Sequence, residues 1–359
     1  MNGVPATYWR RMANGSDLRI VARMLVALLT PFSLCYGLIQ RGRAVLYRRG
    51  FCAVKHLPRP VVSIGNITVG GTGKTPVTGW LAGRLLAEGY RVCVLSRGYG
   101  GTLEGTVAVV SDGTNILLGP RECGDEPYLL ASTIPGLMVL IGSDRYAAGM
   151  SAIERSAPDV FLLDDGYQHI RLHRDMNILL LDASSPFGNG HCLPAGSLRE
   201  PRSACHRADW VIHTRCETAD VAVPDLGNIP RASAGHELRD LVPLAGDGGP
   251  IELARLQGRS VAAFAGIADP ERFFADLQRC GARLVYTASL PDHVRYDDRL
   301  IGDLLTADAD FYVTTEKDAV KLRSMPRKLD STVMVARLRL TVHGGERLFN
   351  DLRNLLQKS

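Results

Sequence analysis

The chain has 359 residues, enough for one large domain or two ordinary ones, and its apolar fraction of 46% is sufficient for a buried core. The formal net charge is only +5, and acidic and basic residues are interspersed, which argues against a nucleic-acid-binding protein. The eight cysteines include no C-x-x-C pair and no cluster of the kind that holds zinc. We therefore expect reduced thiols, as in a protein that faces the cytosol.

An uncharged apolar stretch runs from Met24 to Gln40. The arginines that flank it are Arg19, Arg23, Arg41, Arg43, Arg48 and Arg49. This pattern is typical of a membrane-associated segment whose arginines lie among anionic headgroups on the cytoplasmic face. Because the stretch is slightly shorter than the ~20 residues of a span, and Pro31 interrupts it, we expect a helix that lies in the membrane interface. A single span and a buried core helix are alternatives, whereas a cleavable signal peptide fits less well.

Beyond the arginines, short apolar runs alternate with helical stretches, which predicts an α/β fold with a mostly parallel sheet flanked by helices. Strands are expected at Val61 to Ile64, Val92 to Ser96, Thr106 to Ser111, Leu137 to Ile141, Val160 to Asp164, Ile178 to Asp182 and Trp210 to Thr214. Helices are expected at Lys74 to Glu88, Glu126 to Ser132 and Asp144 to Arg155.

The stretch from Pro224 to Pro250 is rich in Gly, Pro and Asp, which predicts an irregular segment or a connection between domains. A second unit is expected beyond it, with strands at Ser260 to Ala265, Phe311 to Thr315 and Thr332 to Leu340, and a helix at Pro270 to Arg279 that Gly281 ends. We therefore expect an N-terminal membrane-associated segment over residues 1–50, a core domain over 51–225 and a smaller C-terminal α/β domain over 226–359.

A glycine-rich loop lies between the first predicted strand and the helix that follows it. When a strand, a glycine-rich loop and a helix follow one another, the backbone N–H groups of the loop and the N-terminus of the helix can surround phosphate oxygens. In such a loop Lys74 reaches the β and γ phosphates, and Thr75 can bind Mg²⁺. The usual phosphate-loop pattern has glycine where this chain has Thr68, so the loop is a variant. The predicted nucleotide-binding residues are Thr68, Val69, Gly70, Gly71, Thr72, Gly73, Lys74 and Thr75. The fold expected for the core is that of the P-loop NTPases.

An acidic residue at the end of a neighbouring strand completes such a site, because it holds the metal ion directly or through water. The strand-like run from Val160 ends in Asp164 and Asp165. Ligands of open α/β sheets bind at the carboxyl ends of strands, so we expect Asp164 to face the same crevice as Lys74. For Asp165, a turn or a helix cap is an alternative.

The loop and several further segments resemble the tetraacyldisaccharide 4'-kinase family, Thr68 included. The matching segments are Gly65 to Pro76, Ser96 to Gly100, Gly124 to Pro127, Asp164 to His169, Pro194 to Pro201, Pro291 to His293 and Thr314 to Lys321. The resemblance implies the use of ATP and Mg²⁺, and phosphorylation of the 4'-hydroxyl of an acylated glucosamine disaccharide 1-phosphate. It also implies work at the cytoplasmic face of a Gram-negative inner membrane, in the synthesis of lipid A.

The same resemblance implies tasks for individual residues. Asp125 accepts the proton of the sugar hydroxyl and is supported by His293, while Lys74 and Arg199 act on the phosphates. The implied metal ligands are Thr75, Asp164, Asp165 and Glu200. Taken without the resemblance, Asp125 is typical of a helix N-cap and His293 of a surface turn.

Other matching residues have less definite tasks. Arg97 and Tyr99 follow a strand end, where a guanidinium can engage a phosphate of the lipid or of the nucleotide. His169 can equally be a packed polar residue at the edge of the sheet. Glu316, Lys317 and Asp318 follow a strand, and the sequence suggests no task for them. Because His293 lies in the predicted second unit, we expect two domains to close in order to bring it to Asp125.

Two other classes of function share the phosphate loop. A switch GTPase or a metal-chaperone ATPase is the first, but this chain has Thr315-Glu316-Lys317-Asp318 in place of an N-K-x-D guanine motif. It has neither clustered cysteines nor a histidine tract for metal delivery. A membrane-attached module that binds nucleotide without turnover is the second, and it leaves Asp125 and His293 without a task.

Overall fold

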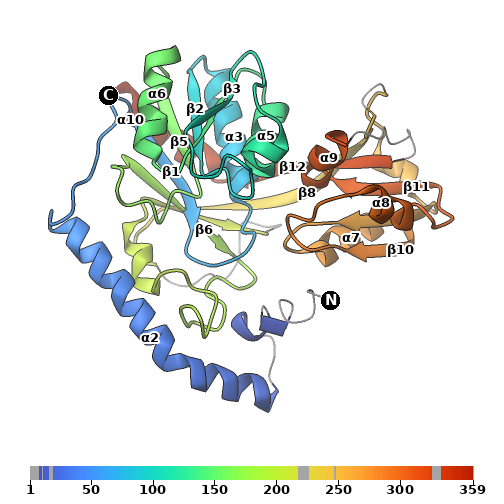
Figure 1. Cartoon of the computed structure of the whole chain (residues 1–359), viewed down its shortest axis with the longest axis horizontal. Helices are drawn as coiled ribbons and strands as arrows, with labels where there is room; N and C mark the ends of the chain where they lie inside the picture. Colours follow the sequence, from blue (N-terminus) through green and yellow to red (C-terminus); the bar gives the residue numbers. More distant parts are fainter. Residues whose placement is uncertain are drawn as a thin grey trace. The chain divides into compact units, whose positions relative to one another are not determined.

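The computed structural model describes residues 8–9, 11–15, 19–216, 226–245, 248–325 and 333–358 (Figure 1). The chain divides into two compact units. Unit 1 consists of Met1–Ser96, Asp144–Gly235 and Val342–Ser359, and unit 2 of Arg97–Ser143 and His236–Thr341. All eight cysteines are free thiols.

A parallel sheet forms the centre of unit 1. Its strands, in spatial order, are β7 (Trp210–Thr214), β6 (Met176–Asp182), β1 (Val61–Asn66), β5 (Val160–Asp164) and β2 (Val92–Ser96). Nearly every residue of these strands is buried, as is typical of a parallel sheet that is covered on both faces. This arrangement confirms the predicted α/β fold.

Helices of unit 1 pack against this sheet. Helix α3 (Lys74–Ala87) contacts β1, β2 and β5, and α6 (Arg145–Ser156) contacts β2. Helix α10 (Gly345–Gln357) is joined to α3 by a two-pronged ion pair between Arg84 and Glu346, at 2.6 and 3.1 Å. A short 3-10 helix, η1 (Arg202–Arg207), precedes β7. Helix α10 thus belongs to unit 1, although residues 236–341, which precede this part of the chain, belong to unit 2.

The predicted apolar stretch lies within one long helix, α2 (Ile20–Arg48). The helix continues through Pro31, where the sequence indicated an interruption. By length and composition it is long and apolar enough to cross a membrane. One face packs on unit 1, since the Ser33 hydroxyl donates to the Cys192 carbonyl oxygen at 2.8 Å and Tyr36 packs on a buried cluster that includes Leu198. The opposite side carries exposed apolar side chains, among them Leu28, Phe32 and Leu38.

Unit 2 contains two groups of strands. The first pairs β3 (Ala108–Asp112) with β4 (Met138–Ile141) in antiparallel fashion, with α4 (Pro120–Cys123) and α5 (Asp125–Thr133) between them in the chain. The second has the spatial order β10 (Arg283–Ser289), β9 (Ser260–Ala265), β11 (Phe311–Thr315), β12 (Val333–His343) and β8 (Arg231–Pro243). Strand β8 begins in unit 1, where its first residues pair with β7, and the last two residues of β12 also belong to unit 1. The helices of this part are η2 (Leu253–Leu256), α7 (Pro270–Arg279), α8 (Asp298–Leu304) and α9 (Glu316–Arg323).

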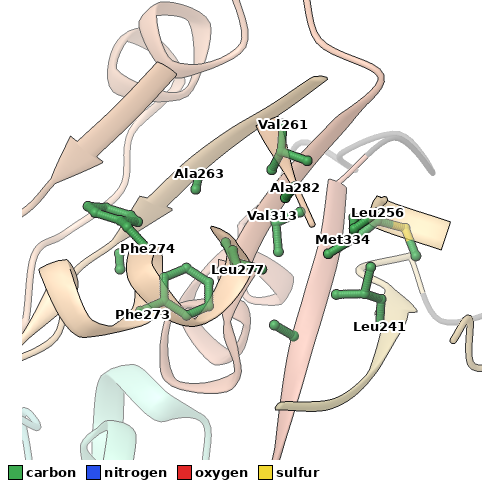
Figure 2. Packing of buried hydrophobic residues seen from close by; sticks show 12 residues of the cluster. Leu241, Leu256, Val261, Ala263, Phe273, Phe274, Leu277, Ala282, Val313 and Met334 are labelled. Carbon is green, nitrogen blue, oxygen red and sulfur yellow. The ribbon is translucent and has the colours of Figure 1, made fainter. Parts of the chain in front are cut away.

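A hydrophobic cluster holds the second group of strands to α7 (Figure 2). Phe273, Phe274 and Leu277 lie on α7 at the spacing of one helix face, and they pack with Val261 of β9 and Val313 of β11. Leu277 is fully buried. This packing gives unit 2 an apolar core of its own.

Most predicted elements occur within one or two residues of their expected bounds, but two expectations differ from the structure. The stretch from Pro224 to Pro250 was expected to be an irregular segment or a connection between domains. It is not irregular, since its described part contains the thirteen-residue strand β8, but the boundary between the two units does fall within it, after Gly235. Its glycines and prolines lie mostly outside β8, and neighbouring strands supply the pairing that local composition does not reveal. The division expected at residue 225 also differs, because residues 97–143 belong to the same unit as residues 236–341. Parts of the expected segment and domains lie outside the residues that the structure describes, namely residues 1–7, 10, 16–18, 217–225, 246–247, 326–332 and 359.

The buried position of Leu277 leads to a stability prediction. Leu277→Ala removes a fully buried side chain and leaves a cavity, so it should lower the free energy of unfolding by about 2–5 kcal/mol. Leu338→Ala is the matched control, because Leu338 is 42% exposed, and its effect should stay within ~0.5 kcal/mol. Urea unfolding followed by circular dichroism measures both. Equal effects of the two variants would contradict the core described for unit 2.

Candidate active site

The chain that follows β1 is held by a second segment before it turns. The Val69 amide donates to the Ser197 carbonyl oxygen at 2.7 Å, and the Arg199 amide donates to the Ile67 carbonyl oxygen at 2.7 Å. Thr68 is bridged to Leu198 in antiparallel fashion. Thr68 is therefore part of an extended pairing rather than of the turn, which explains why the position does not require glycine.

The turn comes after this pairing. Gly70 has a φ of 122°, a conformation that other residues rarely adopt. Helix α3 begins at Lys74, and its N-cap is Gly73, which has no side chain to bond the first amides of the helix. The Thr72 hydroxyl is buried and has no hydrogen-bond partner within the described ranges. Free amide donors and a positive helix terminus are what a phosphate group requires.

Lys74 lies between an amide and a carboxylate. Its Nζ is 3.5 Å from Asn66 Oδ1 and 3.7 Å from Asp165 Oδ1, and its side chain is only 12% exposed. Asp165 also pairs with Arg199, at 2.9 Å. The loop, the end of β5 and the segment after Leu198 thus bring two cations and a carboxylate together.

The acidic pair at the end of β5 has two different environments. Asp164 is buried, and its Oδ1 accepts a hydrogen bond from the Thr78 hydroxyl of α3 at 3.0 Å. Asp164 is paired in register with Ile64 of β1, so it lies at the carboxyl end of its strand; that it faces the same crevice as Lys74 stays a prediction. Burial alone would raise the pKa of Asp165, but Lys74 and Arg199 outweigh it and hold that pKa below its ordinary value.

Arg199 was expected to act on the phosphates and the neighbouring Glu200 to bind the metal ion, and in the structure their side chains contact different partners. Glu200 is buried and accepts two hydrogen bonds from the Arg207 guanidinium, at 2.8 and 2.9 Å. Gln168 donates both to Glu200, at 3.2 Å, and to the Asn66 carbonyl oxygen, at 2.7 Å. These contacts join the segment that carries Arg199 to the end of β1. They give Glu200 a structural task.

A second group of polar residues lies in unit 2, at the start of α5. Asp125 Oδ2 is 3.1 Å from His293 Nδ1. Gly124, before the helix, has a φ of 90°, and a Cβ there would lie 2.6 Å from the Tyr99 carbonyl oxygen, so only glycine fits. His293 also has a positive φ, of 61°, a strained conformation that is found at functional sites.

The pairing of Asp125 with His293 corrects one expectation. Both residues belong to unit 2, so no closure of two domains is needed to bring them together. The sequence suggested otherwise because residues 97–143 were assigned to the core domain. That the C-terminal domain closes during turnover stays a prediction.

Electrostatic surroundings keep Asp125 charged. Burial opposes its charged form, but the hydrogen bond from His293 and the ammonium groups of Lys321 and Lys317 outweigh burial and lower the pKa of Asp125. Tyr99 lies edge-on to the His293 ring, with 5.4 Å between the ring centroids. Asp125 is therefore ready to accept a hydrogen bond from a hydroxyl group near neutral pH.

The remaining predicted residues have clear positions. Arg97 is well exposed and pairs with Glu104 at 3.3 Å. Burial, assisted by the charge of Arg145, lowers the pKa of His169 to about 4, so His169 is a neutral packed residue. The Glu316 carboxylate accepts a hydrogen bond from the Leu338 amide at 3.1 Å.

Sequence reasoning missed several residues of these groups, among them Asn66, Arg145, Gln168, Arg207 and Lys321. Asn66, Gln168 and Lys321 lie inside segments that resemble the family, and this was their signal in the sequence. Arg145 was visible only as the second residue of the helix expected at Asp144 to Arg155, and its charge acts on Asp165.

The donor set near Lys74 fits Mg²⁺. Carboxylate and hydroxyl oxygens are the hard ligands that Mg²⁺ prefers, and Thr75, Asp164 and Asp165 supply them. Among the described residues, no group of three or more His, Cys, Asp or Glu side chains could hold a metal ion alone. In proteins Mg²⁺ is usually bound by one or two carboxylates, with phosphate oxygens and water completing its shell.

A parallel sheet, a glycine loop before Lys74 and an acidic strand end define a P-loop nucleotide-binding protein. A family model described as tetraacyldisaccharide-1-P 4'-kinase matches residues 25–357. The chain belongs to this family. It is 56% identical to the tetraacyldisaccharide 4'-kinase of Pelobacter propionicus, over 100% of both chains, and 52% identical to that of Geobacter sulfurreducens, over 88% of this chain and 89% of that protein.

A solved structure is also similar to the chain. The crystal structure of the "apo" form of LpxK from Aquifex aeolicus in complex with ATP has a TM-score of 0.79 and 35% identity. The similarity covers 92% of this chain and 99% of that chain. The membership in a kinase family excludes the two other classes of function considered from the sequence.

The contact between Arg207 and Glu200 leads to a second stability prediction. Arg207→Met leaves a buried carboxylate without its two-pronged partner, so it should lower the free energy of unfolding by ~3–5 kcal/mol. Arg353→Met is the control, because Arg353 pairs with Glu88 at 3.7 Å near the surface, and it should cost less than about 1 kcal/mol. The double variant Arg207→Met with Glu200→Gln should recover part of the loss. Urea unfolding of the three proteins checks this, and no loss in Arg207→Met would refute the assigned contact.

Proposed function

We propose that this protein transfers the γ-phosphate of ATP to the 4'-hydroxyl of a tetraacylated glucosamine disaccharide 1-phosphate, a step of lipid A synthesis. The observation that carries the proposal is the position of Lys74 at the start of α3, beside Asp165 and behind the glycine loop. The ATP in the similar Aquifex structure and the names of the relatives support the nucleotide and the acceptor.

In this proposal, unit 1 holds the phosphates. The amides of the loop and of the first turn of α3 donate to phosphate oxygens, and Lys74 neutralises the β and γ groups. Arg199, which Asp165 orients at 2.9 Å, is the second cation near the transferred group. When bound, Mg²⁺ would be held by Thr75, Asp164 and Asp165 and would neutralise the charge that develops on the phosphates.

The chemistry requires little covalent work from the protein. The 4'-oxygen of the sugar forms a bond to the γ-phosphorus, the bond from that phosphorus to the β–γ bridging oxygen breaks, and ADP leaves with the bond electrons. The hydroxyl proton passes to Asp125, which His293 orients, and then to water. Positioning and charge neutralisation account for most of the rate increase.

We also propose that α2 attaches the protein to the cytoplasmic face of the inner membrane. Its outer face carries exposed apolar side chains such as Leu28 and Phe32, while Ser33 is buried against the Cys192 backbone. Because one face is occupied by the protein itself, a helix lying in the interface fits these contacts better than a span. The acylated substrate resides in the same membrane, so attachment raises its local concentration.

Two substitutions test the catalytic assignment. Lys74→Met should lower phosphotransfer about 100-fold or more by removing charge from the phosphates, and Asp125→Asn should lower kcat about 100-fold or more while ATP binding is kept. Radiolabelled ATP with the purified disaccharide lipid in detergent gives the rates, and calorimetry gives the binding of Mg·ATP.

Asp112→Asn is the control for Asp125→Asn. Asp112 is exposed and orders a turn through its side chain, a task that asparagine also performs. It should retain the activity of the unaltered protein. Rates close to those of the unaltered protein in Lys74→Met or Asp125→Asn would remove that residue from the mechanism. No binding of Mg·ATP to the folded protein would end the kinase proposal.

The membrane assignment has its own test. The double variant Leu28→Glu with Phe32→Glu places two charges on the outer face of α2, and it should abolish sedimentation with vesicles of phosphatidylethanolamine and phosphatidylglycerol. Leu117→Glu is the control, because Leu117 is also an exposed leucine but lies outside α2, and this variant should still sediment. Sedimentation of the double variant to the same extent would show that α2 is not the anchor.

A further inference from the structure

The segment Thr314 to Lys321 matched the family, but the sequence suggested no task for it. In the structure it forms the end of β11 and the first turns of α9. Lys317 and Lys321 are four residues apart, so both ammonium groups lie on the same face of α9, which packs against α5. Asp125 is the first residue of α5.

Lys321 lies against Asp125. Its Nζ is 3.4 Å from Asp125 Oδ2 and 3.6 Å from Asp318 Oδ1, and the side chain is only 11% exposed. The ammonium group is also 5.9 Å from the centre of the Tyr296 ring, a contact that favours a cation. Because this ammonium group is buried, its attraction for the Asp125 carboxylate is screened much less than at a surface.

Lys317 lies on the His293 side of the contact between Asp125 and His293. Its Nζ donates to Asp292 Oδ1 at 2.9 Å, and it is 3.5 Å from Glu126 Oε1 and 3.5 Å from His293 Nε2. An ammonium group can only donate hydrogen bonds, so its approach to Nε2 favours a ring that is unprotonated there. The ring proton then lies on Nδ1, from which it can be donated to Asp125 Oδ2 at 3.1 Å.

Asp318 fixes the helix in this position. Its Oδ2 accepts from the Gly266 amide at 2.9 Å and from the Thr315 hydroxyl at 2.7 Å, and the side chain is fully buried. The Thr315 hydroxyl in turn accepts from the Asp318 amide as the N-cap of α9. The start of α9 is thereby joined to the end of β9, which holds both lysines in place.

The carboxylates around Asp125 and His293 explain why two lysines are needed to keep Asp125 charged. Beside the lysines, the titratable groups are the carboxylates of Glu126, Asp292 and Asp318, the phenols of Tyr99 and Tyr296, and the Cys123 thiol. Three carboxylates close to a fourth disfavour its ionisation. Each lysine is paired with at least one of these carboxylates and lies close to Asp125 or His293.

We propose that Lys317 and Lys321 are positioning residues of the proposed phosphotransfer. Lys321 keeps Asp125 a carboxylate, and Lys317 keeps His293 in the tautomer that carries its proton on Nδ1. This inference rests on the proposed function for its catalytic meaning, but the state of the His293 ring is a property of the protein alone. The segment after β11 therefore sets the protonation state of the group that receives the hydroxyl proton.

A direct test reads the ring without any turnover. In the full-length protein labelled with ¹⁵N-histidine, the His293 signals, assigned by their loss in His293→Gln, should show a protonated Nδ1 and an unprotonated Nε2 at neutral pH. Lys317→Met should increase the tautomer protonated on Nε2, whereas Lys358→Met, at an exposed lysine, should not. An Nε2-protonated ring in the unaltered protein would overturn the assignment for Lys317.

A second test reads Asp125 through the pH dependence of kcat/KM. Lys321→Met should move the acid limb of the profile to higher pH by about one unit or more, because a cation beside the carboxylate is lost. Lys321→Arg should restore most of the shift, and Lys358→Met should leave the profile unchanged. An unmoved acid limb in an active Lys321→Met enzyme would overturn the role of Lys321.

The two tests separate the inference from the proposed function. If the protein fails to phosphorylate the disaccharide lipid, the ring tautomer and a ¹³C titration of the Asp125 carboxyl group, each compared between the unaltered protein and the lysine variants, still decide the roles of the lysines. A carboxyl group that titrates at or above the ordinary range of aspartate would contradict the role of Lys321. If phosphotransfer is present and both readouts are unaffected by the substitutions, only the inference about the lysines fails.

Discussion

The backbone pairing between residues 67–69 and residues 197–199 is the constraint on which the nucleotide site depends. Two hydrogen bonds of 2.7 Å hold the chain extended after β1, so the turn cannot begin before Gly70. The same pairing brings Arg199 to Asp165 and places the cation beside the end of β5. The variant phosphate loop and the position of Arg199 thus have one physical cause.

Each unit places a charged group among partners that keep it charged. In unit 1, Lys74 and Arg199 hold the Asp165 carboxylate ionised against the effect of burial. In unit 2, His293, Lys321 and Lys317 do the same for Asp125. Burial strengthens these interactions because little water screens them. Both carboxylates therefore remain charged near neutral pH, as the metal ligand and the proton acceptor of the proposed reaction must be.

Helix α2 combines two kinds of surface on one element. Ser33 and Tyr36 face the protein, where they contact the segment that ends in the paired residues 197–199. The opposite face is apolar and exposed. The helix that we propose as the membrane anchor is consequently packed on the chain segment that carries Arg199.

The sequence by itself determined the order of strand, glycine loop and helix, the acidic end of β5 and the bounds of most elements. These features follow from signals that extend over only a few residues: the conformational freedom of glycine, the position of a charge and the period of hydrophobic residues. It did not predict β8, nor the grouping of residues 97–143 with residues 236–341, since both depend on which distant strands pair. The contact of Asp125 with His293 joins residues 168 positions apart. Only tertiary packing decided that contact and the place of Lys321, because the free energy of each comes from partners that no local pattern specifies.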